Sequence, residues 1–165
     1  MSDQIKRQKV FDFFKKHKID YELHEHPPVF TCEEAEKYIN HLPGIHSKNL
    51  VLVDKKKSRI FMVTLEAEKR LDLKWFRKFV QAPKLSFAKE EILNENLGLS
   101  GGSVSPFGLI NDKNQKIIYY LDKDVYDANQ VNFHPNDNTA SLVLNKKMFH
   151  CFLEKMKHKI SFIKI

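Results

Sequence analysis

The chain has 165 residues, of which 42% are hydrophobic and 30% charged, with only five glycines, six prolines and two cysteines. This composition is typical of one globular domain and excludes a disordered, collagen-like or disulfide-rich protein. The first ten residues lack an apolar signal core, and no apolar run approaches the roughly 20 residues of a membrane span. We therefore expect a soluble, cytoplasmic protein without a membrane partner.

The formal net charge of +7 is concentrated at the two ends of the chain. Residues 1–18 carry six basic and two acidic side chains, residues 145–165 carry six basic and one acidic, and the remainder has a net charge of −2. Such segregated positive charge suits a polyanion such as nucleic acid, because phosphate contacts supply affinity without base specificity. The alternative is a lysine-rich exterior that only faces water.

In the first part of the chain, apolar spacing and capping residues indicate alternating helices and strands. Thr31 and Glu34 match a capping box, whereas Pro27 and Pro28 interrupt regular structure. The predicted elements are an amphipathic helix over 3–18, a strand over 21–26, a helix over 31–40, and a hairpin of strands 47–54 and 59–66 with a lysine turn at 55–57.

The second part continues the irregular alternation of helices and strands. Asp72, Gly98 and Asn145 are helix boundary signals. The predicted elements are helices from 72 to 80, over 90–98 and after 145, and strands over 116–122, 130–134, 140–144 and 161–165. Without a repeat or a GxGxxG fingerprint, this order predicts one α+β domain built on a mixed sheet.

Lys48 stands at the start of the otherwise apolar strand 47–54. An ammonium group is costly to bury without a partner, so one directed into a cleft would bind an anionic or carbonyl oxygen of a substrate. Alternatively, the lysine reaches water from the end of its strand.

The segment 101–108, GGSVSPFG, is a second candidate site. Its glycines permit positive φ and Pro106 fixes the exit of the loop. The exposed amides of such a loop can form an anion-binding nest or an oxyanion hole, although a plain turn is the alternative.

His134 follows an alternating strand and precedes a proline, and a structural histidine is the competing interpretation. His24, His26 and Cys32 lack a convincing fourth ligand, so we expect no metal and no cofactor. The sequence also lacks a GxSxG elbow, an HExxH motif and a P-loop, and neither cysteine lies in a nucleophile context. An enzyme with this sequence would use little covalent chemistry of its own.

Together these segments resemble the YbaK/ProX family of aminoacyl-tRNA deacylases, which is related to the editing domain of bacterial prolyl-tRNA synthetase. The HPPVFT opening and the K-N-L that begins at Lys48 are similar to the free-standing, alanine-specific ProXp-ala branch. The similar blocks are HPPVFTCEEAE at 26–36, LPGIHSKNLVL at 42–52, LDLKW at 71–75, LSFA at 85–88, GSVSPFGLIND at 102–112, LD at 121–122 and FHPNDNTA at 133–140.

The resemblance implies a single editing domain over 1–165, with a mixed β-barrel-like sheet flanked by helices. It implies hydrolysis of the ester between alanine and the terminal ribose of proline tRNA. The implied partner is tRNA(Pro) charged with alanine, prolyl-tRNA synthetase is a second candidate partner, and DNA is not expected. A deacylase of the same family for serine or cysteine, and a non-catalytic tRNA-binding module, are the alternatives.

The resemblance also implies the site. Lys48 matches the essential lysine and would hold the ribose-phosphate end or the developing charge; amides near Gly102 would bind the carbonyl or oxyanion; and His134 would form the pocket wall. Asn136 and Lys89 depart from the family pattern, the first at the expected pocket rim. The expected substrate-binding residues are Ser103, Val104, Ser105, Pro106, Asn138 and Thr139, and a nucleophilic role for Ser103 or Ser105 has no support.

From the charge distribution alone, the basic ends would hold the tRNA backbone. The residues expected to contact phosphate are Lys6, Arg7, Lys15, Lys16, Lys155 and Lys157.

Overall fold

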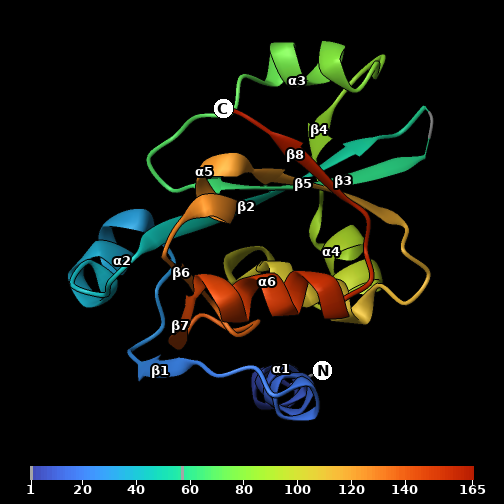
Figure 1. Ribbon diagram of the computed structural model, residues 1–165. Coiled ribbons are helices and arrows are strands. Elements are labelled where there is room, and N and C mark those ends of the chain that lie inside the picture. The colour runs from blue at the N-terminus through green and yellow to red at the C-terminus, as the bar shows by residue number, and fades with distance from the viewer. Residues whose placement is uncertain (1, 57) are drawn as a thin grey trace.

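The computed structural model describes residues 2–56 and 58–165, which form a mixed sheet with helices on both faces (Figure 1). The helices are α1 (Asp3–His17), α2 (Cys32–Ile39), α3 (Leu73–Phe79), α4 (Glu90–Leu97), α5 (Lys123–Asp127) and α6 (Lys146–Lys155), with two 3-10 turns, η1 (Gly101–Ser103) and η2 (Pro106–Asn111). The strands are β1 (Glu22–Glu25), β2 (Ile45–Asp54), β3 (Arg59–Glu66), β4 (Ser86–Phe87), β5 (Ile117–Asp122), β6 (Gln130–Phe133), β7 (Ala140–Asn145) and β8 (Ile160–Ile163).

The strands follow the order β1-β7-β6-β2-β3-β5-β8, and β4 pairs separately with β2. The predicted β2–β3 hairpin is antiparallel, whereas β3–β5, β5–β8 and β2–β6 are parallel. The predicted mixed sheet flanked by helices is therefore confirmed. It is open, because no ladder among the described residues joins β1 to β8.

Strand β2 changes its neighbour part-way along its length. Ile45 and His46 pair with β6, Leu52 and Val53 pair with β4, and β3 runs along the other edge from Ser47 to Asp54. Residues 47–50 consequently have a strand neighbour on one edge only within the described part of the chain. Lys48 lies in this interrupted stretch of the sheet.

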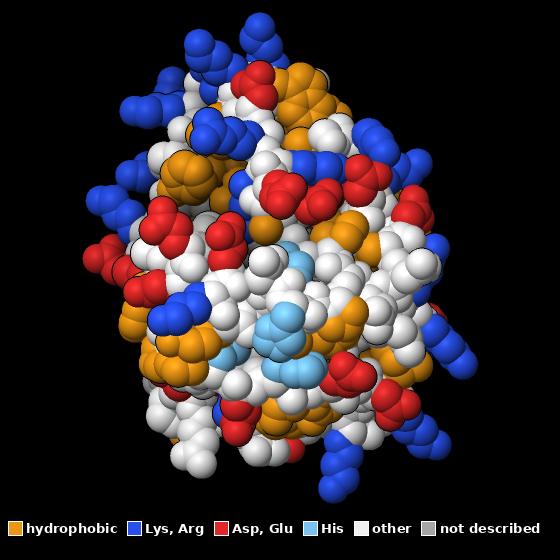
Figure 2. Space-filling view, turned by 90° about the vertical axis from the view of Figure 1, so that its left-hand side faces the viewer, with side chains coloured by type: hydrophobic (Ala, Val, Ile, Leu, Met, Phe, Trp, Pro, Cys, Tyr) orange, Lys and Arg blue, Asp and Glu red, His pale blue; other side chains and the backbone are white. Residues whose placement is uncertain are grey.

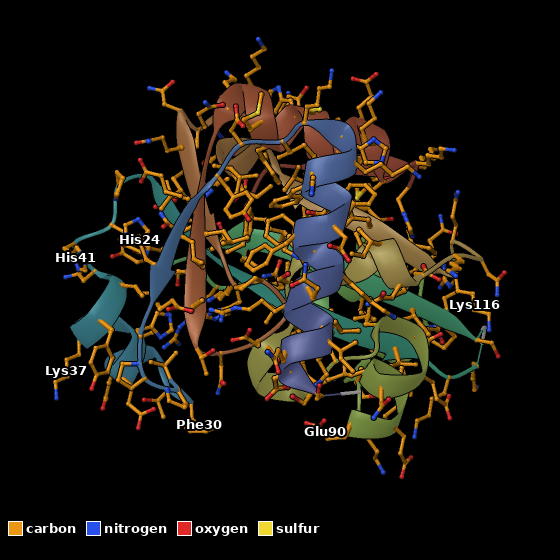
Figure 3. All side chains as sticks on the ribbon, turned by 90° about the horizontal axis from the view of Figure 1, so that it is seen from below. His24, Phe30, Lys37, His41, Glu90 and Lys116 are labelled. Atoms are coloured by element: carbon orange, nitrogen blue, oxygen red, sulfur yellow. The ribbon has the colours of Figure 1, made fainter. Side chains whose placement is uncertain are left out.

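Two cores lie on opposite faces of the sheet. The larger contains Phe14 of α1, Phe107 of η2 and Phe152 of α6 in edge-to-face contact, with ring centroids 4.9–6.2 Å apart. The smaller packs Phe76 of α3 against Phe61 and its neighbours. Figure 1 shows α3 above the sheet and α1 and α6 below it, and from below α1 crosses in front of the rest of the fold (Figure 3).

Local capping signals predicted the helix ends well. The capping box of Thr31 and Glu34 is present, Asp72 and Asn145 accept from amides in the first turns of α3 and α6, and Gly98 ends α4 with φ 66°. The short elements β4, α5, η1 and η2 were not predicted, because they have two to six residues and no hydrophobic period. Lys57 of the predicted lysine turn lies outside the described residues. None of the described helices is long and apolar enough to cross a membrane.

Candidate functional site

Lys48 lies opposite Leu65 in the β2–β3 ladder. Because side chains alternate along a strand, it shares with His46 and Leu50 the face that α3 covers. Its side chain is partly exposed and forms no hydrogen bond or ion pair with any residue the structure describes. The ammonium group is therefore available to a ligand.

The next residue, Asn49, connects this part of β2 to the glycine loop. Its amide nitrogen donates to the carbonyl of Val104 at 3.4 Å, and its Oδ1 accepts from the Thr64 hydroxyl at 2.6 Å. Tyr119 donates to the same hydroxyl at 3.0 Å, and complete burial raises the pKa of Tyr119, which keeps it a donor. This buried network holds the loop next to the strand that carries Lys48.

In the loop, the Gly101 amide donates to Glu90 Oε1 at 2.9 Å, and the Ser103 amide donates to the Ser100 carbonyl at 3.1 Å. Figure 3 labels Glu90, at the start of α4. The intervening Gly102 is exposed, and its amide has no hydrogen-bond partner in the described part of the chain. The loop thus presents one free amide, which can donate to an oxyanion.

The conformational reason expected for Gly102 is wrong. The described glycines with positive φ are Gly44 and Gly98, and a Cβ built on Gly102 would meet no atom within 4 Å. A requirement for glycine at this position would therefore arise from the approach of a substrate and not from the turn itself.

The two loop serines are occupied by structural hydrogen bonds. Ser105 is fully buried, donates to Asn136 Oδ1 at 2.9 Å and accepts from the Phe107 amide at 3.1 Å. Ser103 is also buried and bonds to Ser100. Asn136, expected at the pocket rim, is instead fully buried, with φ 64°, and does not line the pocket.

A small pocket that opens to solvent, with a cavity volume of about 30 Å³, lies between β2, β6 and α2. His46 is directly opposite Asn132 in the β2–β6 register, so the two strands form its floor. Figure 2 shows histidines gathered near the middle of this side of the molecule. The lining residues are Ile39, His46, Ser47, Asn49, Asn132, Phe133, His134 and Ser141.

His134 has a defined tautomer. Its Nδ1 lies 3.2 Å from the carbonyl oxygen of Ala140, which can only accept, so Nδ1 carries the hydrogen. Burial lowers the pKa of His134, which keeps the ring neutral at pH 7. Its Nε2 consequently has a free lone pair, and no described residue donates to it.

Two further acceptors in the pocket wall also lack a donor. Ser47 Oγ and Asn132 Oδ1 are buried without a hydrogen-bond partner among the residues that the structure describes, although the Asn132 amide nitrogen donates to the Pro43 carbonyl. A buried polar atom without a partner costs about 1–3 kcal/mol, and a donor brought by a ligand would remove this cost. The pocket is therefore suited to a group with several hydrogen-bond donors.

Two other histidines of this region bond to protein groups. His26 Nε2 lies 3.2 Å from Ser141 Oγ, and His46 Nε2 lies 3.1 Å from the Leu42 carbonyl. Across residues 2–56 and 58–165, no three His, Cys, Asp or Glu side chains are arranged as a metal site.

Of the residues predicted from the sequence, His134 alone lines the pocket, and Lys48 and Gly102 lie on neighbouring segments. Pro106 is buried, Asn138 donates to the Val29 carbonyl at 3.1 Å, and Thr139 bonds to Asp137. These residues support the loops around the pocket. Sequence reasoning missed Ser47, Asn49 and Asn132, whose signal was a polar residue at alternate positions of otherwise apolar strands.

The two basic ends lie together, on the face opposite Lys48. The rings of Phe13 and Phe152 are 5.9 Å apart, and burial together with Lys16, Lys155 and Lys157 lowers the pKa of His17. We call the surface formed by Lys15, Lys16, Lys155 and Lys157 the terminal basic surface.

Two of the six cations expected to contact phosphate are engaged elsewhere. Lys6 pairs with Asp3 at 3.0 Å. Arg7 pairs with Glu25 at 3.0 Å and with the buried Asp137 at 3.1 Å, so it stabilises the loop that follows His134.

Known proteins resemble the chain along most of its length. The model of the aminoacyl-tRNA editing domain matches residues 26–150. The chain belongs to this family. The prolyl-tRNA editing protein ProX of Acetoanaerobium sticklandii is 38% identical over 143 residues, which cover 87% of each chain.

Two further comparisons agree. The prolyl-tRNA synthetase associated domain-containing protein 1 of Danio rerio is 32% identical over 92% of this chain and 83% of its own. A solved structure of a candidate trans-editing enzyme for prolyl-tRNA synthetase superposes with a TM-score of 0.72 over 97% of both chains at 22% identity, which supports the fold. The family predicted for this editing domain is confirmed, and with it the enzyme class, an aminoacyl-tRNA deacylase.

Proposed function

We propose that this editing domain is a free-standing hydrolase that releases alanine from proline tRNA charged with alanine. Support comes from relatives named for prolyl-tRNA editing and from the chemistry of the pocket near Lys48 and Gly102. Such an enzyme acts where tRNA is charged, which in this proposal is the cytoplasm.

The observation that carries the proposal is the set of acceptors without donors at one pocket: Ser47 Oγ, Asn132 Oδ1 and His134 Nε2. An aminoacyl ester carries an α-ammonium group with three N–H donors, as in a lysine ammonium. We assign these three acceptors to that group. The neutral state of His134 matters, because an imidazolium would repel the ammonium and could not accept from it.

The ester is already activated, so the reaction needs a positioned water and a stabilised oxyanion but no protein nucleophile. Water attacks the carbonyl carbon, the ester C–O bond breaks, and the ribose oxygen leaves and takes up a proton. The Gly102 amide donates to the oxyanion, and Lys48 stabilises the developing charge or holds the ribose-phosphate end. The free ribose hydroxyl of the tRNA assists the proton transfer.

Alanine is the preferred substrate because of size. A synthetase pocket built for proline discriminates by only about 1–3 kcal/mol per methylene and admits smaller amino acids. A second, smaller pocket walled by Ile39 and Phe133 excludes the proline ring and admits a methyl group. Serine is the second candidate, since Ser47, Asn49 and Ser141 could bond its hydroxyl.

The test is deacylation of proline tRNA charged with alanine, serine or cysteine. Alanine should be released fastest, yielding free tRNA. Release of serine or cysteine while alanine leaves at the spontaneous rate would overturn the assignment. Lactyl-tRNA(Pro), in which a hydroxyl replaces the ammonium at nearly the same size, is the matched control and should be a poor substrate; equal rates would refute the roles assigned to the three acceptors.

A further inference from the structure

Helix α3 exposes two aromatic rings that its packing does not use. Phe76 is completely buried in the smaller core, whereas Trp75 is 42% and Phe79 49% exposed. Trp75 and Phe79 are four residues apart and stack on each other, with centroids 5.0 Å apart and planes 13° from parallel. They form a flat aromatic platform on the outside of the molecule.

Cations surround this platform. Residues 70–84 contain five basic residues and one acidic residue, a net charge of +4. Arg70, Lys74, Arg77 and Lys78 are exposed, and none forms an ion pair within the part of the chain that the structure describes. Figure 2 shows Lys and Arg side chains around hydrophobic ones at the top of the molecule, where Figure 1 places α3. The α3 surface consists of Arg70, Lys74, Trp75, Arg77, Lys78 and Phe79.

The α3 surface and Lys48 lie on the same face of the sheet. Lys48 is opposite Leu65, and Leu65 packs in one cluster with Phe76 of α3. The terminal basic surface, in contrast, lies over the larger core on the other face. A chain of nucleotides that ends at Lys48 can continue over α3 without passing around the edge of the sheet.

We propose that the α3 surface binds the unpaired nucleotides at the 3′ end of tRNA, with a base stacked on the Trp75–Phe79 pair and phosphates held by Lys74 and Lys78. Stacking platforms between cations are the general means of binding single-stranded nucleic acid, because every base has a π face and every nucleotide a phosphate. The unpaired cations favour this occupant over an apolar protein partner. The inference rests on the proposed tRNA substrate and adds the surface that holds it.

Trp75 is the only tryptophan of the chain, so its fluorescence reports directly on this surface. Uncharged tRNA(Pro) added to the full-length protein should quench the emission. Replacing Phe79 by Ala should weaken binding about tenfold or more. The double change Lys74→Ala and Lys78→Ala should reduce the slope of log affinity against log salt by about 1.4, since each single-strand phosphate contact contributes about 0.7.

The matched control is the double change Lys155→Ala and Lys157→Ala on the terminal basic surface, which should leave the quenching and the salt slope unchanged. Trp75→Phe, which keeps a ring, should bind tRNA nearly as the wild type does in a gel-shift assay, while Trp75→Ala should not. The inference is overturned if tRNA binds without quenching the fluorescence of Trp75, or if the control variant loses more affinity than the α3 variants. It is also overturned if Trp75 is quenched only when the protein dimerises or when the synthetase is added, and not by tRNA.

Failure of the inference and failure of the proposed function are distinguishable. If wild-type protein deacylates alanyl-tRNA(Pro) and the α3 variants retain its KM, the inference fails and the function stands. If α3 binds tRNA but no alanine is released, the function fails and the surface stands.

Discussion

The two faces of the sheet differ in what they contain. Below the sheet, Phe14, Phe107 and Phe152 are completely buried in a continuous aromatic core. Above it, the core is smaller, and Lys48 and His134 Nε2 have no partner among the described residues. The larger core therefore lies opposite Lys48, and the glycine loop packs against that core through Val104 and Phe107.

Both faces are also cationic, with a different relation to the site. Residues 1–18 and residues 70–84 each have a net charge of +4, yet only the second segment lies on the face of Lys48. Net charge alone does not identify a substrate surface; its position relative to the pocket does.

The largest effect, a loss of stability, should come from the larger core. Replacing Phe152 by Ala should destabilise the protein by about 3–5 kcal/mol, because it opens a cavity where three aromatic rings meet. Below the lowered melting temperature, kcat for alanyl-tRNA(Pro) should remain near the wild-type value. Urea unfolding and single-turnover deacylation measure the two quantities; a loss of kcat as large as the loss of stability would show that packing at Phe152 also sets the geometry of the glycine loop.

On the opposite face, Lys48→Ala should have the reverse effect, a loss of activity without a loss of stability. Loss of the unpartnered ammonium should lower kcat/KM at least about 100-fold, the range typical of a lost oxyanion-stabilising donor, and leave the unfolding midpoint unchanged. Lys56→Ala, at the exposed tip of the same hairpin, is the control and should have no effect. Near-normal turnover in a folded Lys48→Ala protein would remove Lys48 from the site.

What could be predicted from the sequence depended on the distance along the chain between the residues that carry each signal. Helix ends followed local rules, since the capping box of Thr31 and the Asp72 and Asn145 caps involve residues two or three positions apart. The pocket did not, because it depends on the parallel register that brings His46 opposite Asn132, 86 residues later. No local pattern encodes that register, so Asn132 and Ser47 were missed. Lys48, Gly102 and His134 were identified because each lies in a motif of the family.

The α3 cations were missed for another reason. The segment between the basic ends has a net charge of −2, because the +4 of residues 70–84 is offset by acidic residues elsewhere in that segment. The sum therefore hides the basic stretch. Ion pairing was equally invisible, since Arg7 is counted as a free cation in the sequence and is bonded to Glu25 and Asp137 in the fold.

A smaller effect is expected for Gly102→Ala. The added Cβ meets no atom within 4 Å in the protein, so stability should be unchanged. It would instead stand beside the free amide where the ester carbonyl approaches, and turnover should fall about tenfold. The buried neighbour Gly108, where a Cβ would lie 2.7 Å from Leu99, should show the opposite, a loss of stability. Unchanged kinetics in Gly102→Ala would show that the loop is only a turn.

The smallest effect is a shift in pH dependence, and it compares one histidine from each face. Burial lowers the pKa of His134, so the neutral ring predominates at pH 7 and Nε2 can accept from the substrate ammonium. As the pH falls through the lowered pKa, protonation removes this acceptor and adds a repulsive charge. The acidic limb of kcat/KM, after subtraction of spontaneous hydrolysis, should therefore lie below pH 6.5. Stability should fall in the same direction, because the unfolded chain takes up the proton at about pH 6.5 and the folded one only at lower pH.

His17 provides the comparison, since its pKa is also lowered, by burial and by three lysines, but it lies on the terminal basic surface. His134→Gln should abolish the acidic limb, because an amide can accept a hydrogen bond but does not titrate. The plateau value of kcat/KM should be several-fold lower than in the wild type. His17→Gln should leave the profile unchanged, because no group of the pocket contacts His17. If the limb followed His17, or stayed in place without His134, the acceptor role of His134 would be wrong and the pocket would have to bind the ammonium through Ser47 and Asn132 alone.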